Sequence, residues 1–171
     1  MQTTREKPAY KFEGIPHVMI VEARFNAQLS DMLLAGAKAE LERAKVSFEV
    51  ITVPGALEIP AAILYSLRAL DFDAIRRRFD GYVALGAVIK GATRHDEIVG
   101  NISAQGLQTL ALDHTLAIGN GILTCETLAQ AQERADPARF DRGGAAAAAC
   151  LRMVELKHDF RLMSKRRWVG R

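Results

Sequence analysis

Cysteine is scarce in this sequence, and its two copies lack metal-binding spacing. The 171 residues contain only Cys125 and Cys150, which lie far apart and form no CxxC motif. Disulfide frameworks and cysteine-based zinc sites need more cysteines at closer spacing. We therefore expect neither, and the cytoplasm is the default location for the chain.

Long apolar segments and a strong charge of one sign are missing too. No stretch approaches the roughly 18 consecutive apolar residues of a membrane span, and residues 1–12 lack the apolar core of a signal peptide. The net charge is only +3, and the basic runs Arg76–Arg78 and Lys165–Arg167 carry no interleaved aromatic residues. These features favour solvated surface and exclude a membrane or nucleic-acid partner from our expectations.

The overall composition is that of an ordinary globular protein. Hydrophobic residues make up 49% and charged residues 25% of the chain, a usual balance. The length fits one domain. We expect a single domain over residues 1–171, with residues 1–16 and 163–171 as flexible or peripheral tails.

Short apolar runs alternate with helix-like segments along the chain. His17–Ala23 is apolar except for His17 and Glu22, as in a buried parallel strand. Leu29, Leu33, Ala37 and Leu41 recur at helical spacing. The pattern predicts strands at residues 17–23, 47–53, 81–89 and 116–124, and helices at 27–45, 57–70, 93–113, 128–134 and 145–162. This alternation predicts an α/β fold, a three-layer sandwich with a central four-stranded parallel sheet, flavodoxin-like.

Unusual residues follow three of the predicted strands. Arg24–Asn26, Pro54–Glu58 and Lys90–His95 each begin where a strand ends. Ligands of open parallel sheets bind outside the carboxyl ends of the strands. The topology therefore predicts that these three segments converge on one functional edge.

The segment after the third predicted strand suits an anion. Gly91 permits a tight turn, Thr93 can cap the following helix, and Asp96 three residues later resembles a capping box. Backbone N–H groups at a helix start suit a phosphate. The sequence contains neither a Walker motif nor GxGxxG, so an ordinary capped helix stays an equal interpretation.

His95 lies in the first turn of that helix. Imidazole is the side chain best suited to proton transfer near neutral pH. A lone histidine is more often structural or exposed, which is the interpretation that we favour for His17, His114 and His158. For His95, its place beside the predicted anion site leaves both interpretations open.

Other residues at this edge have two interpretations each. Phe25 can be core, Asn26 is a natural N-cap, and Glu58 complements a helix dipole. Together they would also form a cradle for a flat, hydrogen-bonding heterocycle. Arg134 ends a helix, where arginine is favoured without any function, whereas Arg142 begins the last helix, where the dipole disfavours it.

Four blocks of sequence together are far more specific than any single residue. They are ARFN (Ala23–Asn26), VPGALEIP (Val53–Pro60), LGAVIKGATRHDEIV (Leu85–Val99) and GILT–ET–AQAQERA (Gly121–Ala135). In order and spacing they resemble the lumazine synthases of riboflavin biosynthesis, and the resemblance runs from His17 to about Lys157.

The resemblance implies a condensation without cofactor or metal. The reactants would be 5-amino-6-(D-ribitylamino)uracil and 3,4-dihydroxy-2-butanone 4-phosphate, and the product 6,7-dimethyl-8-ribityllumazine, the penultimate step before riboflavin. His95 would transfer protons. The positions that match substrate contacts of the family are Phe25, Asn26, Ala56, Leu57, Glu58, Ala87, Val88, Ile89, Ala92, Thr93, Asn120, Arg134 and Arg142.

The resemblance also implies partners. Family sites lie between subunits of a pentamer, so Arg134 and Asn120 would serve a neighbour's site, and a functional link to riboflavin synthase follows from the product. A free pentamer, a decamer and a 60-subunit shell all stay open.

The chain departs from the family pattern at several positions. Leu57 and Asn120 stand where many members have aromatic residues, Asp141–Gly143 replaces a usual Asn-Lys-Gly, and the connection through Arg76–Arg78 is longer. The alternatives are a catalytically weak riboflavin- or lumazine-binding or shell-forming scaffold, and a flavodoxin-like electron carrier. An intact His95 favours the enzyme, and Arg24–Asn26 is not the phosphate loop of a flavodoxin.

Overall fold

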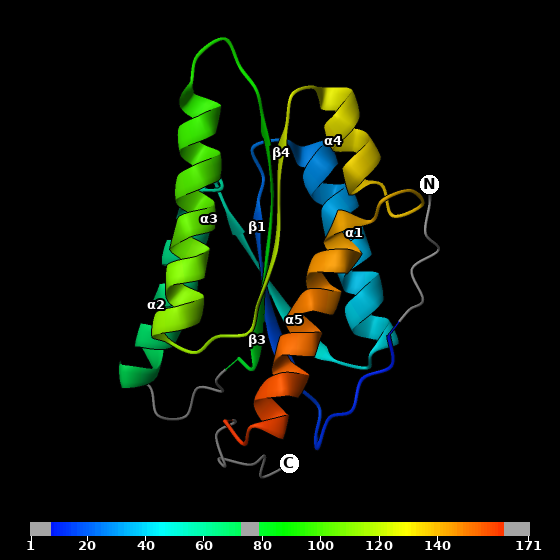
Figure 1. Ribbon diagram of the computed structural model, residues 1–171, viewed down its shortest axis with the longest axis vertical. Helices are drawn as coiled ribbons and strands as arrows, with labels where there is room; N and C mark the ends of the chain where they lie inside the picture. Colours follow the sequence, from blue (N-terminus) through cyan, green and yellow to red (C-terminus); the bar gives the residue numbers. More distant parts are fainter. Residues whose placement is uncertain (1–7, 73–78, 163–171) are drawn as a thin grey trace.

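Four parallel strands form the sheet at the centre of the molecule, in the order β2-β1-β3-β4 (Figure 1). The computed structural model describes residues 8–72 and 79–162. Its strands are β1 (His17–Ala23), β2 (Ser47–Val53), β3 (Gly81–Ile89) and β4 (Ile118–Cys125). Its helices are α1 (Ala27–Arg43), α2 (Glu58–Phe72), α3 (His95–Asp113), α4 (Leu128–Ala135) and α5 (Arg142–Asp159). The predicted three-layer α/β fold is confirmed.

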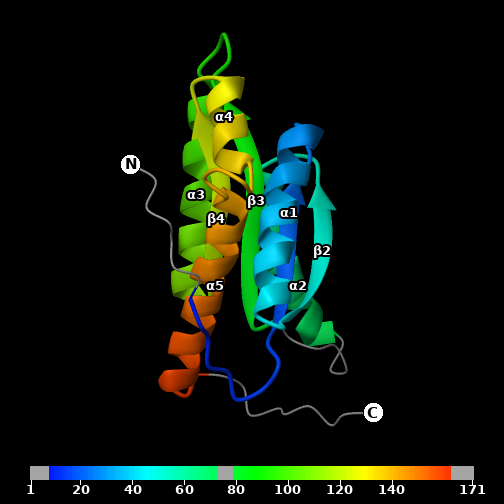
Figure 2. The same cartoon turned by 90° about the vertical axis from the view of Figure 1, so that its right-hand side faces the viewer.

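The helices divide between the two faces of the sheet. Figures 1 and 2 show α2 and α3 on one face and α1, α4 and α5 on the other. Because successive side chains of a strand point to opposite faces, Met19 and Val21 of β1 join the core under α2 and α3, whereas Val18 and Ile20 join the core under α1 and α5. Burial on both faces explains the nearly continuous apolar run of this strand.

β3 extends further at its carboxyl end than its neighbour β1 does. β1 pairs with β3 up to the partners Glu22 and Leu85, whereas β3 pairs with β4 up to Ile89 and Cys125. Within the described residues, Ala87–Ile89 therefore has a strand neighbour on the β4 side alone. We call Ala87–Ile89 the overhang of β3, because its main-chain edge on the β1 side has no strand partner in the part of the chain that the structure describes.

The predicted start of α3 is wrong. The helix begins at His95, its N-cap residue is Arg94, and no side chain makes a capping hydrogen bond. Thr93 Oγ1 accepts only a long bond of 3.4 Å from the backbone N–H of His95. The capping box predicted for Thr93 and Asp96 does not form, because Thr93 stands one residue before the N-cap.

The last helix begins earlier than predicted, and its two glycines lie inside it. α5 starts at Arg142, and Asp141 caps it by accepting a hydrogen bond of 3.0 Å from the backbone N–H of Gly144. A Cβ atom at Gly143 would lie 1.9 Å from the carbonyl oxygen of Leu33. These glycines permit close packing of α5 on α1, a role that the sequence pattern could not distinguish from a loop.

The described part of the N-terminal segment lies against α1 and α5. The Tyr10 hydroxyl donates to Glu40 Oε1 at 2.5 Å, and Arg43 donates to the carbonyl of Pro8 at 2.8 Å. Tyr10 also packs against the core under α1 and α5. The basic runs at residues 76–78 and 165–167 lie outside the described residues. Among the helices that the structure describes, none is long and apolar enough to cross a membrane.

Candidate active site

The three predicted segments meet at the carboxyl edge of the sheet. Because all strands are parallel, the residues after β1, β2 and β3 leave the sheet on the same side. A Cβ atom built at Gly86 would lie 3.4 Å from that of Ala23 and 3.8 Å from that of Ala56. Ala56 is therefore buried between the ends of β1 and β3, and the adjacent Leu57 and Glu58 are exposed at the start of α2.

A hydrogen-bonded turn after β1 presents an exposed aromatic ring. Asn26 caps α1 by accepting a hydrogen bond of 3.2 Å from the backbone N–H of Leu29, as the sequence predicts. The buried Ser30 hydroxyl donates to the carbonyls of Ala23 at 2.7 Å and Asn26 at 2.9 Å. Between these anchors Phe25 is 90% exposed, which excludes the core interpretation of this residue within the single chain.

The overhang of β3 contributes main-chain groups to the same edge. Ala87 and Ile89 pack toward the core under α1, and Val88 toward the core under α2 and α3. All three are half-buried. Unpaired strand edges offer N–H and C=O groups to a ligand, so the position of Ala87–Ile89 suits a heterocycle with hydrogen-bonding edges.

The loop after β3 brings His95 to this edge. Ala92, Thr93 and His95 are all exposed, and His95 is the first residue of α3. Within residues 8–72 and 79–162, the imidazole makes no hydrogen bond. With no side-chain cap, the backbone N–H groups of the first turn are open to an anion at the positive end of the helix dipole.

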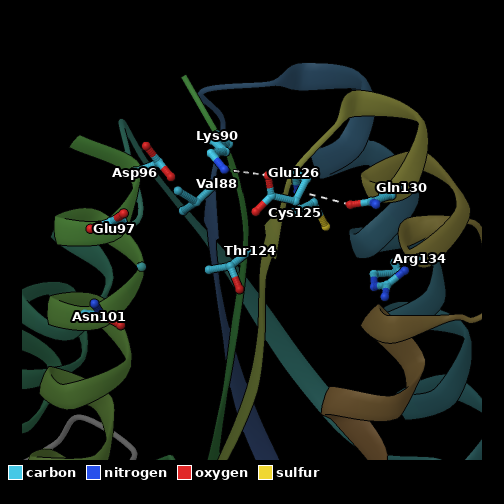
Figure 3. Close-up of a pocket in the computed structure, with 11 residues that line it drawn as sticks. Val88, Lys90, Asp96, Glu97, Asn101, Thr124, Cys125, Glu126, Gln130 and Arg134 are labelled. Atoms are coloured by element: carbon cyan, nitrogen blue, oxygen red, sulfur yellow. Dashed lines mark hydrogen bonds and ion pairs between the residues drawn. The ribbon is translucent and has the colours of Figure 1, made fainter. Parts of the chain in front are cut away.

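A cavity of about 310 Å³ lies between α3 and α4 across the end of β4 (Figure 3). At its rim Lys90 Nζ lies 2.7 Å from Glu126 Oε2, and this contact raises the pKa of Lys90. The Gln130 side chain accepts a hydrogen bond of 3.0 Å from the Glu126 N–H. The sequence reasoning missed Glu126, although it follows the fourth strand just as the predicted segments follow the other three.

A second cavity, of about 350 Å³, lies beside β4 on the α4 and α5 side. Asn120, Arg134 and Arg142 line it, and none of its described lining residues is a carboxylate. Arg134 also lines the first cavity and holds its guanidinium 5.9 Å from the centre of the Phe140 ring. The two arginines give this cavity a positive charge that suits an anionic ligand.

The predicted site residues therefore fall into two groups. One group gathers around the ends of β1, β2 and β3, and includes Phe25, Glu58 and His95. The other, Asn120, Arg134 and Arg142, lines the cavity beside the edge strand β4. The linings of these two cavities do not include Phe25, Glu58 or His95, but Val88 and Arg134 both line the first cavity.

Comparison with known proteins decides the family. Residues 16–158 match the family model described as 6,7-dimethyl-8-ribityllumazine synthase. The chain belongs to this family. A 6,7-dimethyl-8-ribityllumazine synthase of Sphingopyxis alaskensis is 56% identical over 144 residues, which cover 84% of this chain and 96% of the relative.

Two other lumazine synthases match over a similar share of the chain. One, of Agrobacterium fabrum, is 53% identical over 142 residues, covering 83% of this chain and 95% of the relative. Another, of Paramagnetospirillum magneticum, is 44% identical over 147 residues, covering 86% and 98%. The lumazine synthase match thus spans both groups of site residues.

Proposed function

We propose that this chain condenses 5-amino-6-(D-ribitylamino)uracil with 3,4-dihydroxy-2-butanone 4-phosphate to 6,7-dimethyl-8-ribityllumazine, releasing phosphate and water. It would act as a transferase in riboflavin biosynthesis, in the cytoplasm. The observation that carries the proposal is the meeting of Phe25, the β3 overhang and His95 at one sheet edge in a chain of this family. That edge offers a stacking ring, main-chain hydrogen bonds and a proton-transfer group.

The aminouracil would lie at the overhang. The exposed Phe25 ring would stack on the pyrimidine, since offset aromatic stacking is favourable. The main chain of Ala87–Ile89, together with Ala56 and the neighbouring Leu57, would contact the ring and the ribityl chain. Glu58, which is exposed in the first turn of α2, would accept hydrogen bonds from hydroxyl or amine groups.

The butanone phosphate would lie at the start of α3. The backbone N–H groups around Ala92 and Thr93 would bind its phosphate, because a helix start favours an anion. His95 would then stand beside the reacting carbon atoms, where its imidazole could take and return protons during imine formation, phosphate elimination and ring closure. Both reactants carry their own reactive groups, so orientation could supply up to about 7–11 kcal/mol of the barrier reduction.

We further propose that the second group of residues completes a neighbour's site. Arg134 would hold the phosphate of the adjacent subunit, with Asn120 and Arg142 at the other end of the same pocket. The cavity that these three residues line, with two arginines and no described carboxylate, supports this assignment. A head-to-tail interface of this kind forms a ring where its rotation closes, and the resemblance to lumazine synthases implies a ring of at least five subunits.

Turnover of the two substrates tests the function directly. We expect the purified oligomer to form the lumazine, seen by its absorbance, well above the uncatalysed background. His95→Ala should lower kcat about 10²-fold, a usual loss for one proton-transfer group. The exposed His114, at the C-cap of α3, provides a matched control, since His114→Ala should leave turnover unchanged. A folded oligomer without turnover would contradict the proposal and favour the binding or scaffold alternative, as would a tightly held flavin in the absence of activity.

A further inference from the structure

Glu22 is the one acidic residue of β1, and its side chain is 4% exposed. It lies on the same face of the strand as Val18 and Ile20, over the core under α1. A carboxylate is almost never fully buried unless it is paired. The strand therefore tolerates Glu22 because of its partners.

The partners of Glu22 tie three segments together. Arg24 Nη1 donates to both carboxylate oxygens of Glu22 at 3.2 Å. Thr52, its register partner on β2, donates to Oε1 at 2.9 Å. Arg24 uses its other amino group to reach Asp31 Oδ1 in α1 at 2.6 Å. Hydrogen bonds to Asp31 and Glu22 raise the pKa of Arg24.

The hydrogen bonds that join Glu22, Arg24 and Asp31 span the turn that carries Phe25. Their buried end is Glu22 in β1 and their exposed end is Asp31 in α1, whose side chain is 66% exposed. The backbone N–H of Arg24 also bonds to the carbonyl of Val53 at 3.1 Å. Since the Phe25 ring is 90% exposed, its placement depends on the backbone of this turn more than on packing of the ring.

We infer that Glu22 is a positioning residue for the aminouracil: through Arg24 it fixes the turn that presents the Phe25 ring to the pyrimidine. The inference rests on the proposed function and concerns one of the two substrates. The phosphate end of the site lies after β3, where Glu22 makes none of its contacts among the described residues. Loss of Glu22 should therefore weaken binding of the aminouracil and spare the butanone phosphate.

The variant Glu22→Gln keeps the size of the side chain and removes its charge. We expect the KM for the aminouracil to rise about tenfold, since small misplacements of a binding group have large effects. The KM for butanone phosphate and kcat should change less than about twofold. An unchanged aminouracil KM, or an equal rise of both KM values, would overturn the inference.

Glu40→Gln is the matched control. Glu40 is also a buried glutamate, paired with an arginine at 2.6 Å and with the hydroxyl of Tyr10 at 2.5 Å, but it lies in α1 and contacts the N-terminal segment. Both variants should lose thermal stability, and only Glu22→Gln should change the aminouracil KM. A second control is Glu22→Gln in a Phe25→Ala background, where we expect no further rise, because both changes act on the same contact. An additive rise would overturn the inference.

Two further measurements keep the test decisive. If Glu22→Gln does not fold, Thr52→Val removes one bond to the carboxylate and keeps the ion pair, and should raise the aminouracil KM about threefold, in line with the loss of one hydrogen bond. If the wild-type chain shows no turnover, the proposed function fails. Calorimetric binding of the aminouracil then decides the inference, since equal affinity of wild type and variant, or no binding by either, overturns it.

Discussion

The two ends of the sheet each carry a phenylalanine and a histidine, in opposite circumstances. At the amino end His17 is buried, with its ring nitrogens 2.9 Å from Ser47 Oγ and 2.9 Å from Glu49 Oε1. Its ring stacks on Phe79 at 4.9 Å between centroids. At the carboxyl end Phe25 is 90% exposed, and the imidazole of His95 has no hydrogen-bond partner among the described residues.

This difference shows what distinguishes a structural from a functional residue here. The residue types are the same, so chemistry alone cannot separate the two ends. His17 and Phe79 have partners within the chain, whereas Phe25 and the imidazole of His95 are open to solvent. Unsatisfied groups at the ligand-binding edge of a parallel sheet are available for a substrate.

The largest effect that we expect comes from Arg134. Arg134→Ala removes a charged donor, and we expect kcat/KM to fall about 100-fold, since hydrogen bonds to charged groups contribute roughly 1.5–3 kcal/mol. The Arg134 side chain is half-buried and its guanidinium makes no hydrogen bond or ion pair with residues 8–72 or 79–162, so the melting temperature should change little. Steady-state kinetics and calorimetry check both parts.

Mixed oligomers sharpen this prediction. If each site takes His95 from one subunit and Arg134 from its neighbour, random mixing of His95→Ala and Arg134→Ala chains rebuilds about a quarter of the sites, because each interface is heterologous. Co-expression should therefore restore activity well above that of either variant alone. Absence of any recovery would place both residues in a site within one chain.

An intermediate effect is expected at the amino end. His17→Ala removes two side-chain hydrogen bonds and the stacking on Phe79, and should destabilise the fold by about 2 kcal/mol. That corresponds to roughly 4–8 °C in melting temperature for a domain of this size. Turnover of the folded protein at room temperature should not change. A fall in turnover without a fall in melting temperature would contradict the division between the two ends.

The smallest effect is a pH dependence close to the amino end. Cys150 packs against the first residue of β3, and burial raises the pKa of its thiol to about 12. The pKa of a cysteine thiol in an unfolded chain is about 8.5. The contribution of the neutral thiol to stability is therefore complete below about pH 8.5 and is lost as the pH rises toward 12.

Urea unfolding across the alkaline range checks this prediction. The unfolding midpoint of the wild type should fall as the pH rises above the pKa of the unfolded thiol. Cys150→Ala should show a shallower fall, whatever its stability at neutral pH. Parallel curves would show that the thiol does not contribute.

Strong local patterns made most of the fold predictable. The apolar run His17–Ala23 gave the bounds of β1 correctly, because burial on both faces leaves little ambiguity. The predicted start of α5 was wrong. Gly143 and Gly144 are typical of a loop in sequence, but in the structure they permit close packing of α5 on α1. Local sequence cannot distinguish these roles, since the difference depends on a neighbouring helix.

The site was predictable in part. Convergence of the segments after β1, β2 and β3 follows from the parallel topology, which the alternation of strands and helices indicates. That Asn120, Arg134 and Arg142 share a cavity depends on β4 lying at the sheet edge, which local sequence patterns do not indicate. Glu22 was also missed, because the apolar run around it indicates a strand and says nothing of how one charge within it is paired.

The overhang of β3 has a consequence for sequence variation. Hydrogen bonds from Ala87–Ile89 to a heterocycle would come from the main chain, which every residue except proline supplies completely. The side chains of these residues point into the two cores. Packing therefore limits which amino acids these three positions can accept. Leu57, whose side chain is exposed at the same edge, is under no such constraint. Directed evolution toward altered heterocycles should accumulate changes at Leu57 and leave the strand untouched.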